Sequence, residues 1–160
     1  MTRIGPDVLT HFLLYNKWTM KKLCKKFFWY FGNNSEFRPM ALAVNCNLIW
    51  IGNNVVIRPF SVLIADGKII IEDNVLLGCG VHIYTSNHRH DKCKPIIEQG
   101  YEEPKDVIIG RGSWIGANSI ILPGVAIGEN AVVGAGSIIT KDVPKNSTYI
   151  GKHERLIKER

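Results

Sequence analysis

The segment IGRGSWIGANSIILPGVAIGENAVVGAGSIITKDVP, residues 109–144, repeats a pattern of six residues through six consecutive hexads. The first position of each hexad is always a branched aliphatic residue, and the fifth is always small or compact. The first positions are Ile109, Ile115, Ile121, Ile127, Val133 and Ile139, and the fifth positions are Ser113, Ser119, Val125, Ala131, Ser137 and Val143. A period of six matches neither an α-helix nor a two-faced strand. The repeat therefore predicts a coiled structure built from one short unit.

A parallel β-helix satisfies this period. If each hexad supplies a short strand and a turn, three hexads close a triangular coil and residues eighteen apart stack. Branched side chains then fill the interior, where they suit a pleated surface. Glycine and asparagine at the second to fourth positions permit the corner conformations: Gly110, Gly116, Asn118, Gly124, Gly128 and Asn130. An ordinary β-sandwich would not keep six hexads in phase. We therefore expect an all-β fold, whose handedness does not follow from the period.

The repeat also extends upstream, with two interruptions. It runs from Ile51 through Leu63 and resumes at Ile71 two residues out of phase, which indicates a bulge or tight loop near residues 66–68. The second interruption, residues 84–108, is polar and predicts a protruding loop. We divide the chain accordingly into a helical capping segment (1–40), the β-helix with its loop (41–145) and a tail (146–160).

Composition sets the broad class. The 160 residues are 46% hydrophobic and 21% charged, which indicates one globular domain. No apolar run approaches the roughly 18–20 residues of a membrane helix, and no secretion signal is evident. The four cysteines lack zinc-site spacing, so we expect reduced thiols in a cytoplasmic protein. The net charge of +6 comes with no nucleic-acid-binding motif, so we expect no nucleic acid partner.

The segment HFLLYNKWTMKKLCKKFFWYFGNN, residues 11–34, has a different pattern. Its apolar residues Phe12, Met20, Leu23 and Phe27 recur near helical spacing with lysines between them. An amphipathic helix is expected. Two roles stay open for it: covering the open end of the prism, or peripheral contact with an anionic membrane at its inner face.

The stretch GVHIYTSNH, residues 80–88, followed by the loop and then by residues 107–144, resembles a known family. Residues 45–160 are similar to the hexapeptide-repeat acyltransferases, most closely the maltose and galactoside O-acetyltransferases and their relatives in polysaccharide biosynthesis. The resemblance implies a left-handed parallel β-helix and a homotrimer whose sites lie between subunits. It also implies transfer of an acetyl group from acetyl-CoA to a hydroxyl of a sugar or polysaccharide precursor, with no metal.

His88 stands where this family places its catalytic histidine. The resemblance implies that His88 is the general base, and an imidazole suits proton removal near neutral pH. A histidine that only structures the loop is the alternative. His90 matches no fixed role and is expected to be solvated. Cys93 lies close by, but the family transfers the acyl group directly and needs no thiol nucleophile.

The resemblance also assigns acceptor-binding residues. Asp66 matches a carboxylate that contacts sugar hydroxyls in the galactoside enzymes, and it falls at the phase slip. Asn87, in the same SNH motif as His88, is assigned to the acceptor as well. Arg58 replaces an amide-bearing side chain, which suggests an acceptor with an anionic group or a different shape.

The implied acetyl-CoA track runs along the C-terminal coils. Small residues would let the pantetheine arm approach the backbone, and Lys or Arg would bind phosphates. The assigned residues are Trp114, Ala117, Ala135, Thr140, Lys141, Arg155 and Lys158. Solvated charges and a purely structural indole are the alternatives. The family usually has Gly-x-Pro near the tail, whereas this chain has Gly151-Lys152-His153-Glu154, so the path of the tail is open.

Other functions remain as alternatives. N-Acetyltransferases of nucleotide-linked amino sugars also use acetyl-CoA, but often carry a nucleotide-binding domain that this chain is too short to hold. A non-catalytic trimeric scaffold is a third class, and the intact SNH loop argues against it. The zinc carbonic anhydrases built on the same prism need three metal histidines in a spacing unlike that of His82, His88 and His90.

Overall fold

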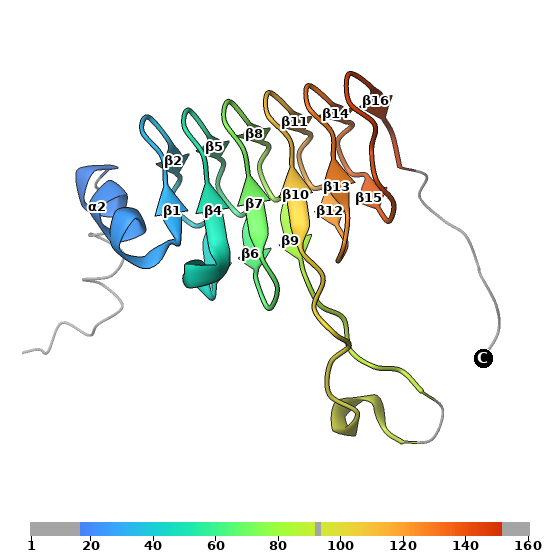
Figure 1. Cartoon of the computed structure of the whole chain (residues 1–160). Helices are drawn as coiled ribbons and strands as arrows, with labels where there is room; N and C mark the ends of the chain where they lie inside the picture. The colour runs from blue at the N-terminus through green and yellow to red at the C-terminus, as the bar shows by residue number, and fades with distance from the viewer. Residues whose placement is uncertain (1–16, 92–93, 152–160) are drawn as a thin grey trace, which may run out of the picture.

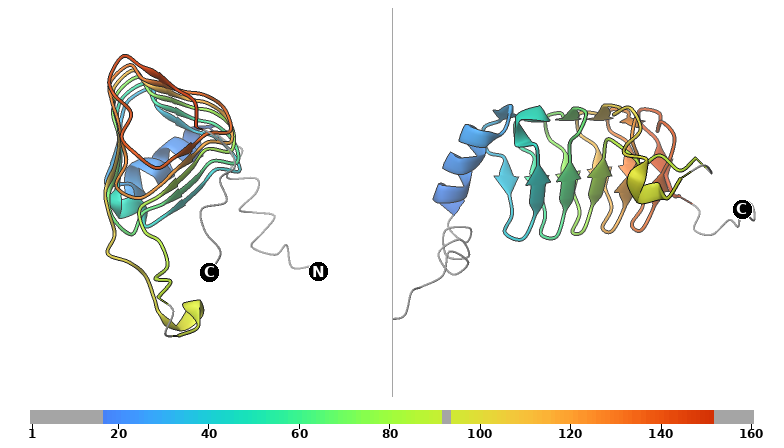
Figure 2. Two further views of the ribbon diagram at one scale, coloured as in Figure 1. Left: turned by 90° about the vertical axis from the view of Figure 1, so that its right-hand side faces the viewer. Right: turned by 90° about the horizontal axis from the view of Figure 1, so that it is seen from below.

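The computed structural model describes residues 17–91 and 94–151. It is a triangular prism of stacked β coils with one helix, α2 (Lys17–Phe27), at its N-terminal end (Figure 1). Two short 3-10 helices, η1 (Cys46–Leu48) and η2 (Ile96–Glu98), complete the helical content of the described residues. The left view of Figure 2 looks along the prism and shows its triangular outline.

Three parallel sheets form the sides of the prism, and we call them faces A, B and C. Face A contains β1 (Tyr30–Phe31), β4 (Ile49–Ile51), β7 (Ile69–Ile71), β10 (Val107–Ile109) and β13 (Ala126–Ile127). Face B contains β2 (Glu36–Phe37), β5 (Val56–Ile57), β8 (Leu76–Leu77), β11 (Trp114–Ile115), β14 (Val132–Val133) and β16 (Thr148–Tyr149). Face C contains β3 (Leu42–Val44), β6 (Val62–Ile64), β9 (His82–Tyr84), β12 (Ile120–Ile121) and β15 (Ile138–Ile139). The predicted parallel β-helix is confirmed.

The first and fifth hexad positions form the core, as the repeat predicts. Ile109, Ile115 and Ile121 are fully buried, one on each face of a coil. Ser113 and Ser119 are also buried, and their hydroxyls donate to carbonyls of the next coil over 2.9 and 3.0 Å. These bonds satisfy groups that would otherwise be costly to bury.

Coil length changes along the prism. In the C-terminal half, Ile109 pairs with Ile127, which is the predicted spacing of eighteen residues. In the N-terminal half, Ile51 pairs with Ile71, so this coil has two extra residues, which confirms the phase slip predicted near residues 66–68. The extra residues lie at the corner between faces C and A, at 65–68. A second set lies at the same corner at 45–48, and this one was not predicted from the sequence.

Corner residues have two separate functions. Asn118, Gly124 and Asn130, at the fourth hexad position, adopt the left-handed conformation with φ between 53° and 83°. The role predicted for Gly110, Gly116 and Gly128 is wrong, because none of them has a positive φ. A Cβ atom at these positions would instead lie 2.4–2.7 Å from a backbone nitrogen of the next coil. They are needed for close stacking.

Helix α2 closes the N-terminal end of the prism (Figure 2). Cys24 and Phe28 are buried and join Phe31 in the core cluster. Of the predicted apolar stripe, Leu23 and Phe27 are exposed, whereas Phe12 lies outside the described residues. Burial raises the pKa of the Cys24 thiol to about 12, with the nearby Cys46 thiol as a smaller cause. The coils begin at β1, inside the segment that the sequence assigned to the cap, and β16 lies in the segment assigned to the tail.

No helix in the described part of the chain has the length and apolar character needed to span a membrane.

The close stacking at glycine can be tested on Gly110, which lies away from the loop. Gly110→Ala should lower the free energy of unfolding by roughly 1–3 kcal/mol, because the new Cβ would lie 2.7 Å from Glu129 N and the coils must separate. Asn34→Gly is the control: Asn34 has φ 56°, which glycine adopts freely, so the change should stay within about 0.5 kcal/mol. Urea unfolding measures both, and equal effects would contradict this role for Gly110.

Candidate active site

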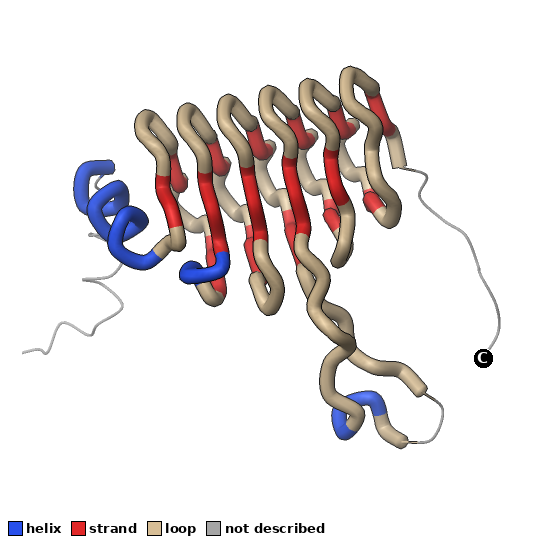
Figure 3. The backbone as a smooth tube through the Cα atoms, viewed as in Figure 1, coloured by secondary structure: helices blue, strands red, loops and turns tan. Residues whose placement is uncertain are grey.

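The protruding loop, residues 85–106, leaves the prism at the corner between faces C and A (Figure 3). The same corner holds only four residues, 65–68, one coil earlier. The two arms of the loop are joined at the base by hydrogen bonds from Lys105 N to Thr85 O, 2.7 Å, and from Glu102 N to Asn87 O, 2.8 Å. The loop is therefore an insertion whose ends remain together.

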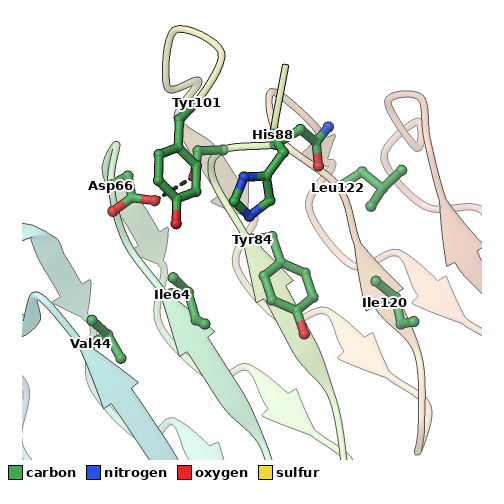
Figure 4. Close-up of a pocket in the computed structure, with 10 residues that line it drawn as sticks. Val44, Ile64, Asp66, Tyr84, His88, Tyr101, Ile120 and Leu122 are labelled. Carbon is green, nitrogen blue, oxygen red and sulfur yellow. Dashed lines mark hydrogen bonds between the residues drawn. The ribbon is translucent and has the colours of Figure 1, made fainter. Parts of the chain in front are cut away.

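A pocket of about 600 Å³ lies between the base of this loop and the outer side of face C (Figure 4). Its floor comes from outward side chains of β3, β6, β9 and β12, and its rim comes from the loop and the corner before β7. The lining residues are Val44, Ile64, Asp66, Tyr84, Ser86, Asn87, His88, Tyr101, Ile120 and Leu122. An apolar floor with a few polar rim groups is typical of a small-molecule site.

The imidazole of His88 is held at this rim by Tyr101. The two residues form an antiparallel backbone bridge, and their ring centroids lie 4.3 Å apart with a tilt of 31°. Figure 4 shows the His88 ring directed into the pocket. Within the described residues its ring nitrogens make no hydrogen bond, so both remain available to a bound molecule.

The backbone around Asp66 is fixed by the buried Thr85 hydroxyl. Thr85 Oγ1 accepts hydrogen bonds from Asp66 N and Gly67 N, at 2.7 and 2.9 Å, and donates to Ile64 O at 3.1 Å. One hydroxyl therefore joins the base of the loop to the preceding corner.

The carboxylate of Asp66 has its own partners. It accepts hydrogen bonds from Ser86 Oγ and, at 3.4 Å, from Asn45 Nδ2. The side chain is exposed at the pocket rim and faces the Tyr101 side of the site (Figure 4). Its remaining acceptor capacity suits a ligand hydroxyl.

Three of the four residues predicted for catalysis and acceptor binding line one pocket: Asp66, Asn87 and His88. Arg58 does not, because it follows β5 at the corner between faces B and C, where it is exposed. His90 is outside the lining and lies 3.9 Å from the Glu102 carboxylate. Cys93 falls outside the described residues.

The sequence analysis missed three polar lining residues. Ser86 precedes the SNH histidine by two residues, and Tyr84 occupies an outward position of β9, so alternation along the strand was an available signal. Tyr84 Oη lies 2.9 Å from Nδ1 of His82. Tyr101 had no local signal, because only the pairing of the two loop arms brings it to His88.

Comparison with known proteins agrees with this geometry. Residues 106–141 match the hexapeptide repeat of succinyl-transferase. The galactoside O-acetyltransferase of Escherichia coli (strain K12) is 35% identical over 140 residues, which cover 87% of this chain and 68% of that protein. The chain belongs to the hexapeptide-repeat acetyltransferases.

Solved structures of this family have the same architecture. A galactoside acetyltransferase in complex with coenzyme A matches with a TM-score of 0.81 and 27% identity, covering 99% of this chain and 85% of that one. A maltose O-acetyltransferase from Clostridium difficile 630 gives 0.72 and 28%, covering 92% and 84%. The chain spans 56% to 68% of the length of the first curated relatives it matches.

The residues that the family resemblance assigned to acetyl-CoA fall on two edges of face C. Ala117 and Ala135 lie in successive coils at the edge with face B, where Gly136 N donates to Ala117 O at 2.7 Å. Thr140 lies at the other edge, next to the lining residue Leu122, because Ile121 pairs with Ile139. Lys141 follows and is exposed.

The other assigned cofactor residues lie apart from the pocket. Trp114 is outward on face B, is 51% exposed and does not line the pocket. Arg155 and Lys158 fall outside the described residues. Within residues 17–91 and 94–151, no group of three or more His, Cys, Asp or Glu side chains is placed to hold a metal ion.

The Thr85 hydroxyl provides a direct test of how the pocket is held. Thr85→Val should lower the free energy of unfolding by roughly 1–3 kcal/mol, since two partly buried N–H groups lose their acceptor while the shape is kept. Thr85→Ser retains the hydroxyl and should lose less. If thermal or urea unfolding shows serine to be as damaging as valine, the hydroxyl does not hold this corner.

Proposed function

We propose that this protein transfers an acetyl group from acetyl-CoA to a hydroxyl of a sugar or polysaccharide precursor, with His88 as the general base. The observation that carries the proposal is the convergence of His88, Asp66 and Asn87 on one pocket at the base of the loop. The similarity to a galactoside O-acetyltransferase supports both the reaction and the class of acceptor.

The chemistry requires one proton to move twice. As an acceptor hydroxyl attacks the thioester carbonyl, His88 takes its proton through a free ring nitrogen. The C–S bond then breaks, and the imidazolium returns the proton to the departing sulfur of coenzyme A. Tyr101, stacked on the ring, would hold His88 in position through both transfers. A positioned general base of this kind contributes roughly a hundredfold to ten-thousandfold in rate.

The remaining lining residues would bind the acceptor. Asp66 would accept hydrogen bonds from sugar hydroxyls, with Ser86 keeping the carboxylate oriented. The side-chain amide of Asn87 would hydrogen-bond to hydroxyls of the same sugar. Tyr84, Ile64 and Ile120 present an apolar surface suited to the C–H groups of a sugar. Arg58 does not reach this pocket within a single chain. Its charge therefore gives no support to an anionic acceptor.

We place acetyl-CoA along the C-terminal coils, beside face C. Thr140 and Lys141 continue the pocket edge by one coil. This position suits contact with the pantetheine arm of acetyl-CoA, which would enter the pocket from that side. Ala117 and Ala135 expose backbone at the opposite edge, with Trp114 beyond them on face B. Arg155 and Lys158 would meet the nucleotide end. We also place the enzyme in the cytoplasm, which fits the free thiols of Cys24, Cys46 and Cys79.

The outer side of face C supports a homotrimer. Leu42, Val44 and Ile138 are 53%, 37% and 41% exposed there, and Val62, Ile64 and Ile120 lie between them. His82 lies between Val62 and Ile120 in this row, with apolar side chains on both sides of it. Exposed apolar patches on a monomer mark an interaction surface. A closed three-fold assembly would cover the part of this surface outside the pocket, at Leu42, Val62 and Ile138, in every copy and would bring a neighbouring subunit beside the loop.

An amine acceptor would need the same base, so the pocket alone does not separate O- from N-acetylation. The relatives favour a hydroxyl. A non-catalytic scaffold is disfavoured because it would need no gathered His, Asp and Asn side chains.

The test is thiol release from acetyl-CoA with a panel of galactosides, maltose, oligosaccharides and nucleotide-linked amino sugars. His88→Ala should lower turnover by roughly a hundredfold to ten-thousandfold with the working acceptor, because the attacking hydroxyl loses its base. Affinity for acetyl-CoA should be unchanged.

His90→Ala is the matched control, since His90 is on the same loop but outside the pocket. It should retain most of the turnover. A similar loss in both variants would show that the loop, rather than the base, had been damaged. Near-normal turnover in His88→Ala would refute the proposed mechanism.

Assembly can be tested on the apolar strip of face C. The native protein should have a mass of about three times 18.0 kDa by light scattering. Leu42→Glu with Ile138→Glu should convert it to a monomer, because each buried, unpaired carboxylate at an interface costs several kcal/mol. Ile108→Glu, on face A and 39% exposed, should leave the trimer intact. A native monomer would contradict the assembly.

A further inference from the structure

The N-terminal end of the prism carries most of the net positive charge of the protein. Residues 17–51 contain six Lys or Arg side chains and one carboxylate, whereas the rest of the chain contains fourteen basic and thirteen acidic residues. Helix α2 has no acidic residue, and its lysines at 21, 22, 25 and 26 are exposed. The positive charge is therefore concentrated at one end of the molecule.

Apolar side chains accompany these lysines at the surface. Leu23 and Phe27, four residues apart on α2, are 36% and 55% exposed, and Lys26 Nζ lies 5.6 Å from the Phe27 ring. The buried contacts described at this end come instead from Cys24 on α2 and from Phe28 just after it. The helix thus has a second apolar stripe that the fold leaves exposed.

The chain continues from α2 into a cluster of exposed aromatic residues. Trp29 and Tyr30 are 51% and 37% exposed, and both pack against Trp50 on face A, with ring centroids 5.6 and 4.3 Å apart. Lys68 Nζ lies 5.6 Å from the Trp29 ring. Tryptophan and tyrosine with a wet polar edge favour the boundary between lipid headgroups and hydrocarbon.

We propose that this end of the prism, formed by α2 with Trp29 and Tyr30, binds peripherally to an anionic phospholipid bilayer. Charge complementarity identifies the partner: lysines would contact the headgroups, while Leu23, Phe27 and Trp29 would enter the interface between them. This is the second of the two roles that the sequence left open for the segment, and the structure shows that it is compatible with capping because the two roles use different residues.

The position of the surface leaves the pocket accessible. Figure 1 shows α2 at the N-terminal end of the prism, whereas the loop leaves from its middle, between β9 and β10. Membrane binding would therefore not cover His88. The proposal goes beyond the acetyl transfer proposed above and does not depend on it.

The experiment is sedimentation of the full chain with vesicles of phosphatidylcholine alone and of equal parts phosphatidylcholine and phosphatidylglycerol. The protein should sediment with the anionic vesicles only, and high salt should weaken the binding, since exposed charges are screened. Lys21→Gln with Lys26→Gln should weaken partitioning about 25-fold, at about fivefold for each lysine at an anionic surface.

A matched control removes the same charge elsewhere. Lys94→Gln with Lys145→Gln, both exposed and distant from α2, should leave vesicle binding unchanged. Phe27→Gln should also weaken binding, whereas Ile97→Gln, at a loop residue 91% exposed, should not. Thermal unfolding of each variant distinguishes lost binding from lost folding.

Three outcomes would overturn the proposal. They are no sedimentation with anionic vesicles, equal sedimentation with neutral ones, and equal loss in the variants of α2 and in their controls. A fourth outcome, a change in mass without vesicles that disappears in Phe27→Gln, would identify a second copy of the chain as the partner instead. Acetyl transfer to a soluble acceptor should be unaffected in every case, so failure here leaves the proposed activity standing.

Discussion

Hydrogen bonding between successive coils is the constraint on which the rest of this structure depends. Each strand has two or three residues and pairs in parallel with a strand of each neighbouring coil on its face. A strand this short has no room for an extra residue, because a shift would turn inward side chains outward along the whole face. Extra residues can therefore enter only at a corner, and they do so at 45–48, at 65–68 and at the loop, all between faces C and A.

The same constraint brings distant residues together at the pocket. Val44, Ile64 and Tyr84 come from three successive coils, yet they lie side by side because β3, β6 and β9 are in register. Asp66 and Ser86 occupy the same corner one coil apart, which explains why they form a hydrogen bond. A rigid stack thus supplies the floor and one rim of the site, and the loop supplies the other rim.

How much the sequence could predict depended on how local each signal was. The hexads predicted the buried ladder residue by residue, since alternation and period report directly on which side chains face inward. His88, Asn87 and Asp66 were found through motif resemblance and a phase slip. Tyr101 was not, because its contact with His88 requires pairing of two loop arms. The role of Leu23 and Phe27 stayed open, because helical spacing alone does not show that Cys24 and Phe28 are buried instead of them. The coil length of twenty was recognised only as one slip, since residues 45–48 precede the regular repeat.

The central claim is that the site results from inserting a loop into a prism that is already complete. Replacing residues 86–105 with Asn-Gly would leave a four-residue corner like 65–68, and Lys105 N lies 2.7 Å from Thr85 O, so the ends are close enough to join. Circular dichroism and thermal unfolding should show a folded β structure with nearly unchanged stability, while acetyl transfer should be lost. A variant that fails to fold would contradict the independence of the prism. A folded variant that still transfers acetyl groups would contradict the assignment of the site.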